Sequence, residues 1–250
     1  MNPWPYPLWI AHRGAGKLAP ENTLAAFRVG ASHGYRAFEC DVKLSADGVP
    51  FLLHDTTLQR TTPAHGVAGE RPWNELARLD AGSWHSRAHA GEPIPSLETI
   101  AHYCMHNGFV LNIEIKPTPG SEHETGDVVA REAARLWASE TVKPLLSSFR
   151  PDALAAAKAA DVSLPRALLL DRVREGWLDD ARALACVAIV ANHAALDDAV
   201  ISQIHAAGMR ALSYTVNDPA TARRLAKAGI DGLITDLVDR FSPMNAAIPD

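Results

Sequence analysis

Cysteine is scarce in this chain, which contains three, Cys40, Cys104 and Cys186. They stand far apart and inside apolar runs, a pattern typical of buried, reduced thiols and not of a disulfide framework. This scarcity argues against a disulfide-stabilised secreted scaffold. We therefore expect a reducing compartment and a cytoplasmic location.

Long apolar runs and clusters of basic residues are also missing. No run approaches the ~20 apolar residues of a membrane span, so we expect none. Met1 to Leu8 has no basic region followed by an apolar stretch, so we expect no cleavable signal. The formal net charge is -5, with both signs spread along the chain. Without a basic stripe, nucleic acid is not expected as a partner.

What the sequence does contain is a regular alternation of β-branched or aliphatic runs with segments of helical period, which is typical of a parallel α/β protein. Its 250 residues, 47% of them hydrophobic, suit one barrel domain spanning residues 1–250. The predicted strands are Leu8–His12, Arg36–Lys43, Phe109–Lys116, Leu145–Phe149, Pro165–Asp171, Val187–Asn192, Met209–Asn217 and Gly232–Asp236. An open doubly wound sheet is the alternative. Because no glycine-rich fingerprint follows an early strand, we predict a (β/α)8 TIM barrel.

One segment interrupts the alternation. A further strand is predicted at Val49–Leu53, and the residues that follow, about 56–95, are rich in Gly, Pro, His and Trp. Irregular segments of this length in compact domains are usually lids or binding loops. We expect a small insertion after the second strand that covers the barrel mouth.

Acidic residues recur at alternate positions in two predicted strands. Glu39 and Asp41 are two residues apart and so point to one face, and Glu114 faces the same interior from the strand Phe109–Lys116. A solvated pair on an edge strand is the alternative, but the apolar residues that alternate with these acids favour a buried strand. Buried carboxylates that converge need a positive partner. Oxygen ligands favour one divalent cation, Mg²⁺ or Ca²⁺, and the sequence does not choose between them.

Two histidines follow strands near these acids. His12 ends the first strand and His54 follows Val49–Leu53, so the two imidazoles are suited to taking and giving a proton. The sequence leaves open which does which, and each could instead be a structural histidine. Arg13 and Lys116 offer positive donors for a phosphate, and a structural ion pair is the alternative for Lys116.

These residues belong to a longer ordered set of motifs. The set is His12-Arg13-Gly14, Pro20-Glu21-Asn22-Thr23, Glu39-Cys40-Asp41-Val42, His54-Asp55, Arg60-Thr61-Thr62, Ile94-Pro95-Ser96-Leu97, Ile113-Glu114-Ile115-Lys116, Ser148-Phe149 and Thr235-Asp236. It resembles the signature of the glycerophosphodiester phosphodiesterase family, in its cytoplasmic bacterial form. The resemblance covers nearly the whole chain, and the complete order and spacing make it specific, although single pieces occur by chance.

The resemblance implies an enzyme that hydrolyses glycerophosphodiesters, such as glycerophosphocholine or glycerophosphoethanolamine, to sn-glycerol 3-phosphate and an alcohol. It assigns metal binding to Glu39, Asp41 and Glu114, acid-base catalysis to His12 and His54, and phosphate binding to Arg13 and Lys116. We further expect supporting roles for Glu21, Asn22 and Tyr214. Glu21 and Asn22 lie at the start of a predicted helix, where capping is the alternative.

It also implies that the insertion covers the glycerol end of the substrate. Tyr214 departs from the Trp common in the family, which would change the alcohol pocket. A lysophospholipase D-like activity on lysophospholipids is the alternative function. A non-catalytic phosphodiester-binding barrel is disfavoured because no predicted site residue is missing. The sequence leaves open whether the chain forms a homodimer.

Overall fold

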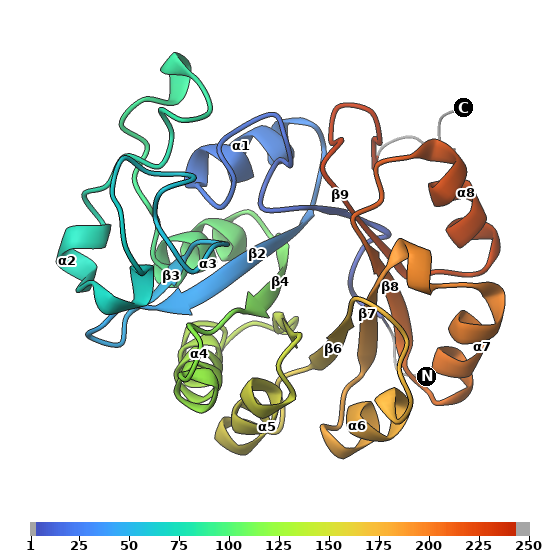
Figure 1. Cartoon of the computed structure of the whole chain (residues 1–250). Helices are drawn as coiled ribbons and strands as arrows, with labels where there is room; N and C mark the ends of the chain where they lie inside the picture. Colours follow the sequence, from blue (N-terminus) through green and yellow to red (C-terminus); the bar gives the residue numbers. More distant parts are fainter. Residues whose placement is uncertain (1–3, 244–250) are drawn as a thin grey trace.

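The computed structural model describes residues 4–243, and within them eight parallel strands close into a barrel surrounded by helices (Figure 1). The barrel strands are β1 Trp9–Ala11, β2 Ala37–Leu44, β4 Val110–Ile115, β5 Leu145–Ser148, β6 Arg166–Leu170, β7 Ala188–Asn192, β8 Arg210–Tyr214 and β9 Gly232–Thr235. Closure comes from β1, which pairs in parallel with both β9 and β2. The predicted (β/α)8 barrel is confirmed, and each predicted barrel strand overlaps an observed one.

The helices between these strands are α1 Leu24–Ser32, α3 Leu97–His106, α4 Glu122–Leu136, α5 Pro151–Ala160, α6 Trp177–Ala183, α7 Asp198–Ala206 and α8 Pro219–Lys227. Their ends follow ordinary capping chemistry. Asp218 accepts a hydrogen bond from the backbone N–H of Thr221 at the start of α8, and Gly229 takes a positive φ of 89° just beyond its end.

Side chains along the strands alternate between two cores. Phe38, Cys40 and Val42 of β2 join the large core between barrel and helices. Inside the barrel, Ile10, Leu169, Val190, Leu212 and Ile234 belong to a second, smaller apolar cluster. Ala37 and Val110, at the starts of β2 and β4, also pack in this cluster, whereas the later inward positions of both strands are polar. The sequence pattern itself thus places their charged side chains inside the barrel.

The insertion packs beside the barrel. β3 Pro50–Leu52 runs antiparallel to β2, and the segment 56–95 that follows contains only short helices, among them α2 Trp73–Leu76. This segment lies beyond β3 and next to α1 (Figure 1). Together with β3 and the residue that follows it, this segment forms a separate small hydrophobic core. The core consists of Phe51, Leu53, Leu58, Ala68, Leu76, Ala81 and Ile94. That it covers the glycerol end of a substrate stays a prediction.

Other expectations from composition meet the structure only in part. The three cysteines are buried and free, as predicted. Among the helices of residues 4–243, none is long and apolar enough to cross a membrane. The start of the segment Met1 to Leu8, and both ends of the predicted domain 1–250, lie outside the described residues. The cytoplasmic location, the absence of nucleic-acid binding and the open question of a homodimer remain at the stage of prediction.

Candidate active site

A cavity of about 340 Å³ opens at the carboxyl ends of the barrel strands, where barrel enzymes keep their active sites. Residues from most of the barrel contribute to its wall. The predicted site residues that line it are His12, Arg13, Glu39, His54, Glu114, Lys116 and Tyr214. Asp41, Asn22 and Glu21 bond to this wall from behind, so the fold brings all ten predicted residues together.

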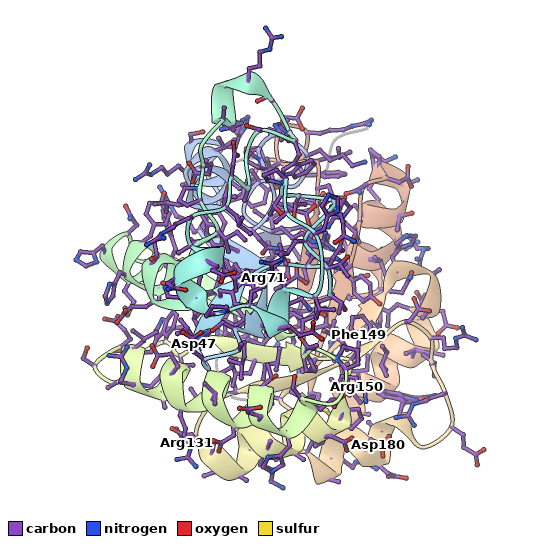
Figure 2. The ribbon with its side chains drawn as sticks, turned by 60° about the vertical axis from the view of Figure 1, so that its left-hand side comes forward. Asp47, Arg71, Arg131, Phe149, Arg150 and Asp180 are labelled. Carbon is purple, nitrogen blue, oxygen red and sulfur yellow. The ribbon has the colours of Figure 1, made fainter. Side chains whose placement is uncertain are left out.

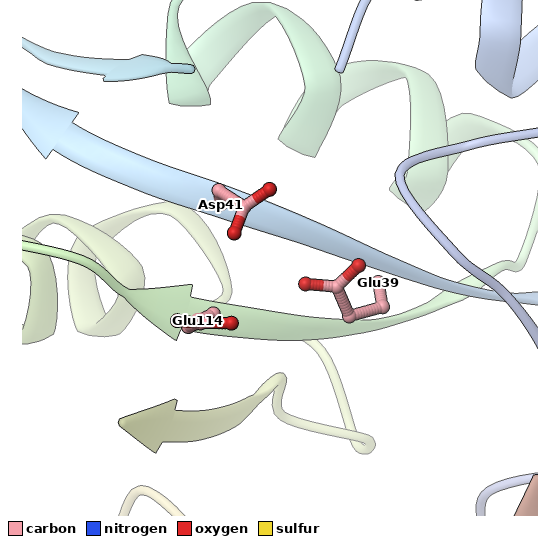
Figure 3. A group of neighbouring side chains, drawn as sticks. All are labelled: Glu39, Asp41 and Glu114. Carbon is pink, nitrogen blue, oxygen red and sulfur yellow. The ribbon is translucent and has the colours of Figure 1, made fainter. Parts of the chain in front are cut away.

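The centre of the site is a group of three carboxylates from two neighbouring strands (Figure 3). In the β2–β4 register Asp41 pairs with Glu114, and Glu39 lies two residues earlier on β2. One carboxylate oxygen from each lies within 4.8 Å of the others. Burial, and then the charge of Asp41, raise the pKa of Glu39 well above its usual range. The three acids therefore do not ionise together easily without added positive charge.

These carboxylates suit a hard divalent cation. Oxygens bound to one ion at about 2.1–2.5 Å lie within about 5 Å of one another, which the three acids satisfy. The donor atoms are all oxygens, with no thiolate in the group, which favours Mg²⁺ or Ca²⁺ over zinc. The residues present thus fit the expected ion.

Two cations stand beside the acids. Lys116 Nζ lies 2.8 Å from Glu114 Oε1 and 3.1 Å from Asp41 Oδ1. Arg13 Nε lies 3.3 Å from Asp41 Oδ2. Burial opposes ionisation of Asp41, but Lys116 and Arg13 outweigh it and bring the pKa of Asp41 below its ordinary value. Both cations also line the cavity.

Glu21 and Asn22 hold this arrangement from behind. Asn22 Nδ2 donates to Asp41 Oδ2 at 2.8 Å, and Asn22 Oδ1 accepts from the Asp41 backbone N–H at 3.1 Å. The N-cap of α1 is Thr23, so the Asn22 side chain is not used for capping. Glu21 accepts from Arg13 at 2.9 Å and from Arg60 of the insertion at 2.7 and 2.8 Å. Glu21 and Asn22 thus contact charged residues of the site, and their supporting roles stay a prediction.

Each catalytic candidate histidine is held by a carboxylate at the same ring atom. His12 Nδ1 lies 2.6 Å from Asp236 Oδ1, and His54 Nδ1 lies 2.7 Å from Asp55 Oδ1. Burial lowers the pKa of His12, but the Asp236 hydrogen bond and the charge of Glu39 outweigh it and raise that pKa. Burial also lowers the pKa of His54, and the opposing charge of Asp41 does not restore it. Nδ1 of each ring is thus engaged, and Nε2 of His12 lies 3.8 Å from Glu39 Oε2.

Comparison with known proteins identifies this constellation. Residues 12–240 match the model of the glycerophosphoryl diester phosphodiesterase family. The chain belongs to this family. A glycerophosphodiester phosphodiesterase of Caldanaerobacter subterraneus is 31% identical over 92% of the chain and 93% of its own length. The Bacillus subtilis protein YhdW is 33% identical over 92% of the chain and 94% of its own length.

A solved structure gives the same result. An Oleispira antarctica phosphodiesterase, in complex with the product sn-glycerol 3-phosphate, is 34% identical and covers 92% of this chain and 93% of its own, with a TM-score of 0.86. The present chain is thus a glycerophosphodiester phosphodiesterase, and the predicted family and enzyme class are confirmed.

The sequence did not reveal what holds the histidines of this phosphodiesterase. Asp236 lies 224 positions from His12 in the sequence. Asn217 fixes Asp236 through two hydrogen bonds: its Nδ2 donates to Asp236 Oδ2 at 2.8 Å, and its Oδ1 accepts from the Asp236 backbone N–H at 2.9 Å. Gly16 allows the chain to pass close by, since a Cβ there would lie 2.1 Å from the Asp236 carbonyl oxygen. Asp236 was part of the recognised motif Thr235-Asp236, but the motif does not indicate that His12 is its hydrogen-bonding partner.

We expect Asp236→Asn to lower kcat by roughly 10- to 10⁴-fold while KM changes little, because carboxylates that fix the tautomer of a functional histidine have effects in this range. Steady-state kinetics on a glycerophosphodiester would measure it. Asp218→Asn is the control, since Asn also caps a helix and Asp218 lies at the start of α8. Equal kcat in Asp236→Asn and wild type would contradict the role of Asp236.

Proposed function

We propose that this phosphodiesterase hydrolyses glycerophosphodiesters such as glycerophosphocholine or glycerophosphoethanolamine to sn-glycerol 3-phosphate and an alcohol, with a divalent cation held by Glu39, Asp41 and Glu114. The observation that carries the proposal is that three carboxylates and two carboxylate-supported imidazoles meet at one cavity, with Asp41 just behind its wall. The product named for the Oleispira antarctica relative supports the choice of substrate class.

The cationic side chains bind the phosphate in this proposal. Arg13 presents a planar fork to two phosphate oxygens, and Lys116 adds a point charge from the end of β4. A bound divalent cation would supply positive charge that balances the three carboxylates and polarises a phosphate oxygen. Asn22 and Glu21 keep Asp41 and Arg13 in place, because both are bonded to them on the side away from the cavity.

The histidines move the protons. With Nδ1 of each ring fixed by Asp236 or Asp55, Nε2 of one ring takes a proton from the attacking oxygen and Nε2 of the other gives one to the departing oxygen. The attacking oxygen comes from a neighbouring glycerol hydroxyl, with water opening the cyclic phosphate afterwards, or from water directly. In either route one imidazole accepts a proton and the other donates one.

A coupled assay for sn-glycerol 3-phosphate tests the proposal. We expect release from glycerophosphocholine or glycerophosphoethanolamine that stops with EDTA and returns with excess Mg²⁺ or Ca²⁺. A lysophospholipid assayed in parallel tests the lysophospholipase D-like alternative. Release that continues unchanged after exhaustive chelation would argue against the metal-dependent mechanism, and a clear preference for the lysophospholipid would favour the alternative.

A further inference from the structure

Two polar side chains deep in the cavity have no hydrogen-bonding partner. Asn112 on β4 is 3% exposed and Ser147 on β5 is 0% exposed. Asn112 Oδ1 and Ser147 Oγ are both buried, make no hydrogen bond among the described residues, and belong to residues that line the cavity. The adjacent Ser148 shows the ordinary situation, since its Oγ donates to the Ile115 carbonyl at 2.6 Å. Buried polar groups without partners are uncommon and concentrate at functional sites.

Their place in the barrel puts them below the phosphate-binding residues. Asn112 pairs in register with Glu39, and Ser147 with Glu114, so both stand beside the carboxylate group. Lys116 lies four residues further along than Asn112, past the end of β4. The other residues lining the cavity at mid-strand depth include the apolar Leu169 and Ile234. The floor of the cavity is thus polar on one side and apolar on the other.

The opposite end of the cavity has a different character. Phe149 and Asp171 follow the ends of β5 and β6, and Tyr214 ends β8, so all three stand at the mouth. Phe149 lies next to Arg150 at the start of α5 (Figure 2), and its ring meets that of Tyr214 at right angles with the centroids 5.8 Å apart. A substrate whose phosphate is bound between floor and mouth would therefore place one ester group in each environment.

We propose that Asn112 and Ser147 bind the hydroxyl groups of the glycerol moiety, which enters the barrel first and leaves the alcohol at the mouth. This orientation replaces the expectation that the insertion covers the glycerol end, and the described residues that line the cavity include none from the segment 56–95. Asn112 Oδ1 accepts a hydrogen bond from one hydroxyl, and Ser147 Oγ pairs with the other. This inference rests on the proposed function and adds to it the orientation of the substrate and two specificity residues. A site that hydrogen-bonds a substrate hydroxyl discriminates against an analogue without it, because its own polar groups are then left unpaired.

The test compares two ligands that differ only in these hydroxyls, sn-glycerol 3-phosphate and propyl phosphate. Their inhibition constants, measured with the Mg²⁺- or Ca²⁺-loaded enzyme, require no reaction of either ligand. We expect wild type to bind sn-glycerol 3-phosphate more tightly, and Asn112→Ala and Ser147→Ala each to weaken that binding by roughly 3- to 10-fold. Affinity for propyl phosphate should stay the same or improve, because the variants leave no polar atom unpaired.

Ser213→Ala is the matched control. Ser213 is a fully buried serine on a barrel strand, but its Oγ donates to the Ala191 carbonyl at 3.2 Å and it does not line the cavity. We expect its ligand preference to equal that of wild type and its melting temperature to fall. Ser147→Ala should keep its melting temperature, because no intramolecular bond is lost.

Two results would overturn the assignment. One is an unchanged preference for sn-glycerol 3-phosphate in both floor variants. The other is an equal loss of affinity for both ligands, which would place Asn112 and Ser147 in structural or metal-binding roles. Release of sn-glycerol 3-phosphate by wild type decides the proposed function separately, so the two failures can be told apart.

Discussion

Replacing His12 by Ala should lower kcat on a glycerophosphodiester by about 10²- to 10⁴-fold, the usual contribution of one positioned acid or base. The ring lines the cavity and its Nδ1 is held by Asp236, so the substitution removes a positioned proton donor or acceptor. KM should change little, because Arg13 and Lys116 remain to bind the phosphate. Steady-state kinetics at saturating Mg²⁺ or Ca²⁺ would give both constants.

His205→Ala provides a matched control for that experiment. Like His12, His205 is held by a carboxylate, with Nε2 2.8 Å from Asp231 Oδ2, but it lies on α7 and does not line the cavity. Its loss should leave kcat unchanged and affect stability alone. If His12→Ala and His205→Ala kept the same kcat, an acid-base role for His12 would be untenable.

The strands and the carboxylate group could be predicted because they depend on local pattern. Apolar residues at every second position of β2 fix which face meets the helices, and the same rule places Glu39 and Asp41 inside. Closure of the sheet then brings Glu114 beside Asp41 without further information. The predicted faces, barrel strands and convergence of acids are therefore confirmed together.

Partners distant in sequence could not be predicted in this way. The bond between Asp236 and His12 exists because β9 closes the barrel beside β1, and no periodicity encodes which loop atoms meet there. Arg60 was part of a recognised motif, yet its contacts with Glu21 and Asp55 depend on how the irregular insertion folds back. Asn112 and Ser147 on the cavity floor are recognised only from the structure, because Asn112 Oδ1 and Ser147 Oγ are buried without a hydrogen bond among the described residues.

Glu39→Gln should have opposite effects on activity and on metal-free stability. Removing one of three carboxylates should lower kcat/KM on the order of 10³-fold, because a bound cation contributes several kcal/mol to charge stabilisation and the variant would hold it poorly. In EDTA, however, the variant should melt at a higher temperature than wild type near neutral pH. Gln is close in shape, and its Oε1 can still accept the 3.1 Å bond from the Arg13 backbone N–H.

The reason lies in the direction of the pKa shift. Burial, and then Asp41, raise the pKa of Glu39, so the folded metal-free protein holds this proton more tightly than the unfolded chain does. Wild type should therefore have its full Glu39 contribution below the ordinary glutamate pKa and lose stability as the pH rises toward the raised value. Gln cannot ionise, so that slope should vanish in the variant.

Melting curves across this pH range, in EDTA and in saturating Mg²⁺ or Ca²⁺, would measure both effects. The cation should raise the melting temperature of wild type by mass action and that of Glu39→Gln much less. Glu98→Gln is the control, because Glu98 is an exposed residue of α3 whose partner Arg135 is also exposed. A lower metal-free melting temperature for Glu39→Gln than for Glu98→Gln would mean that burial and the charge of Asp41 do not destabilise the ionised Glu39 carboxylate. The argument for a cation among the three carboxylates would then lose its physical basis.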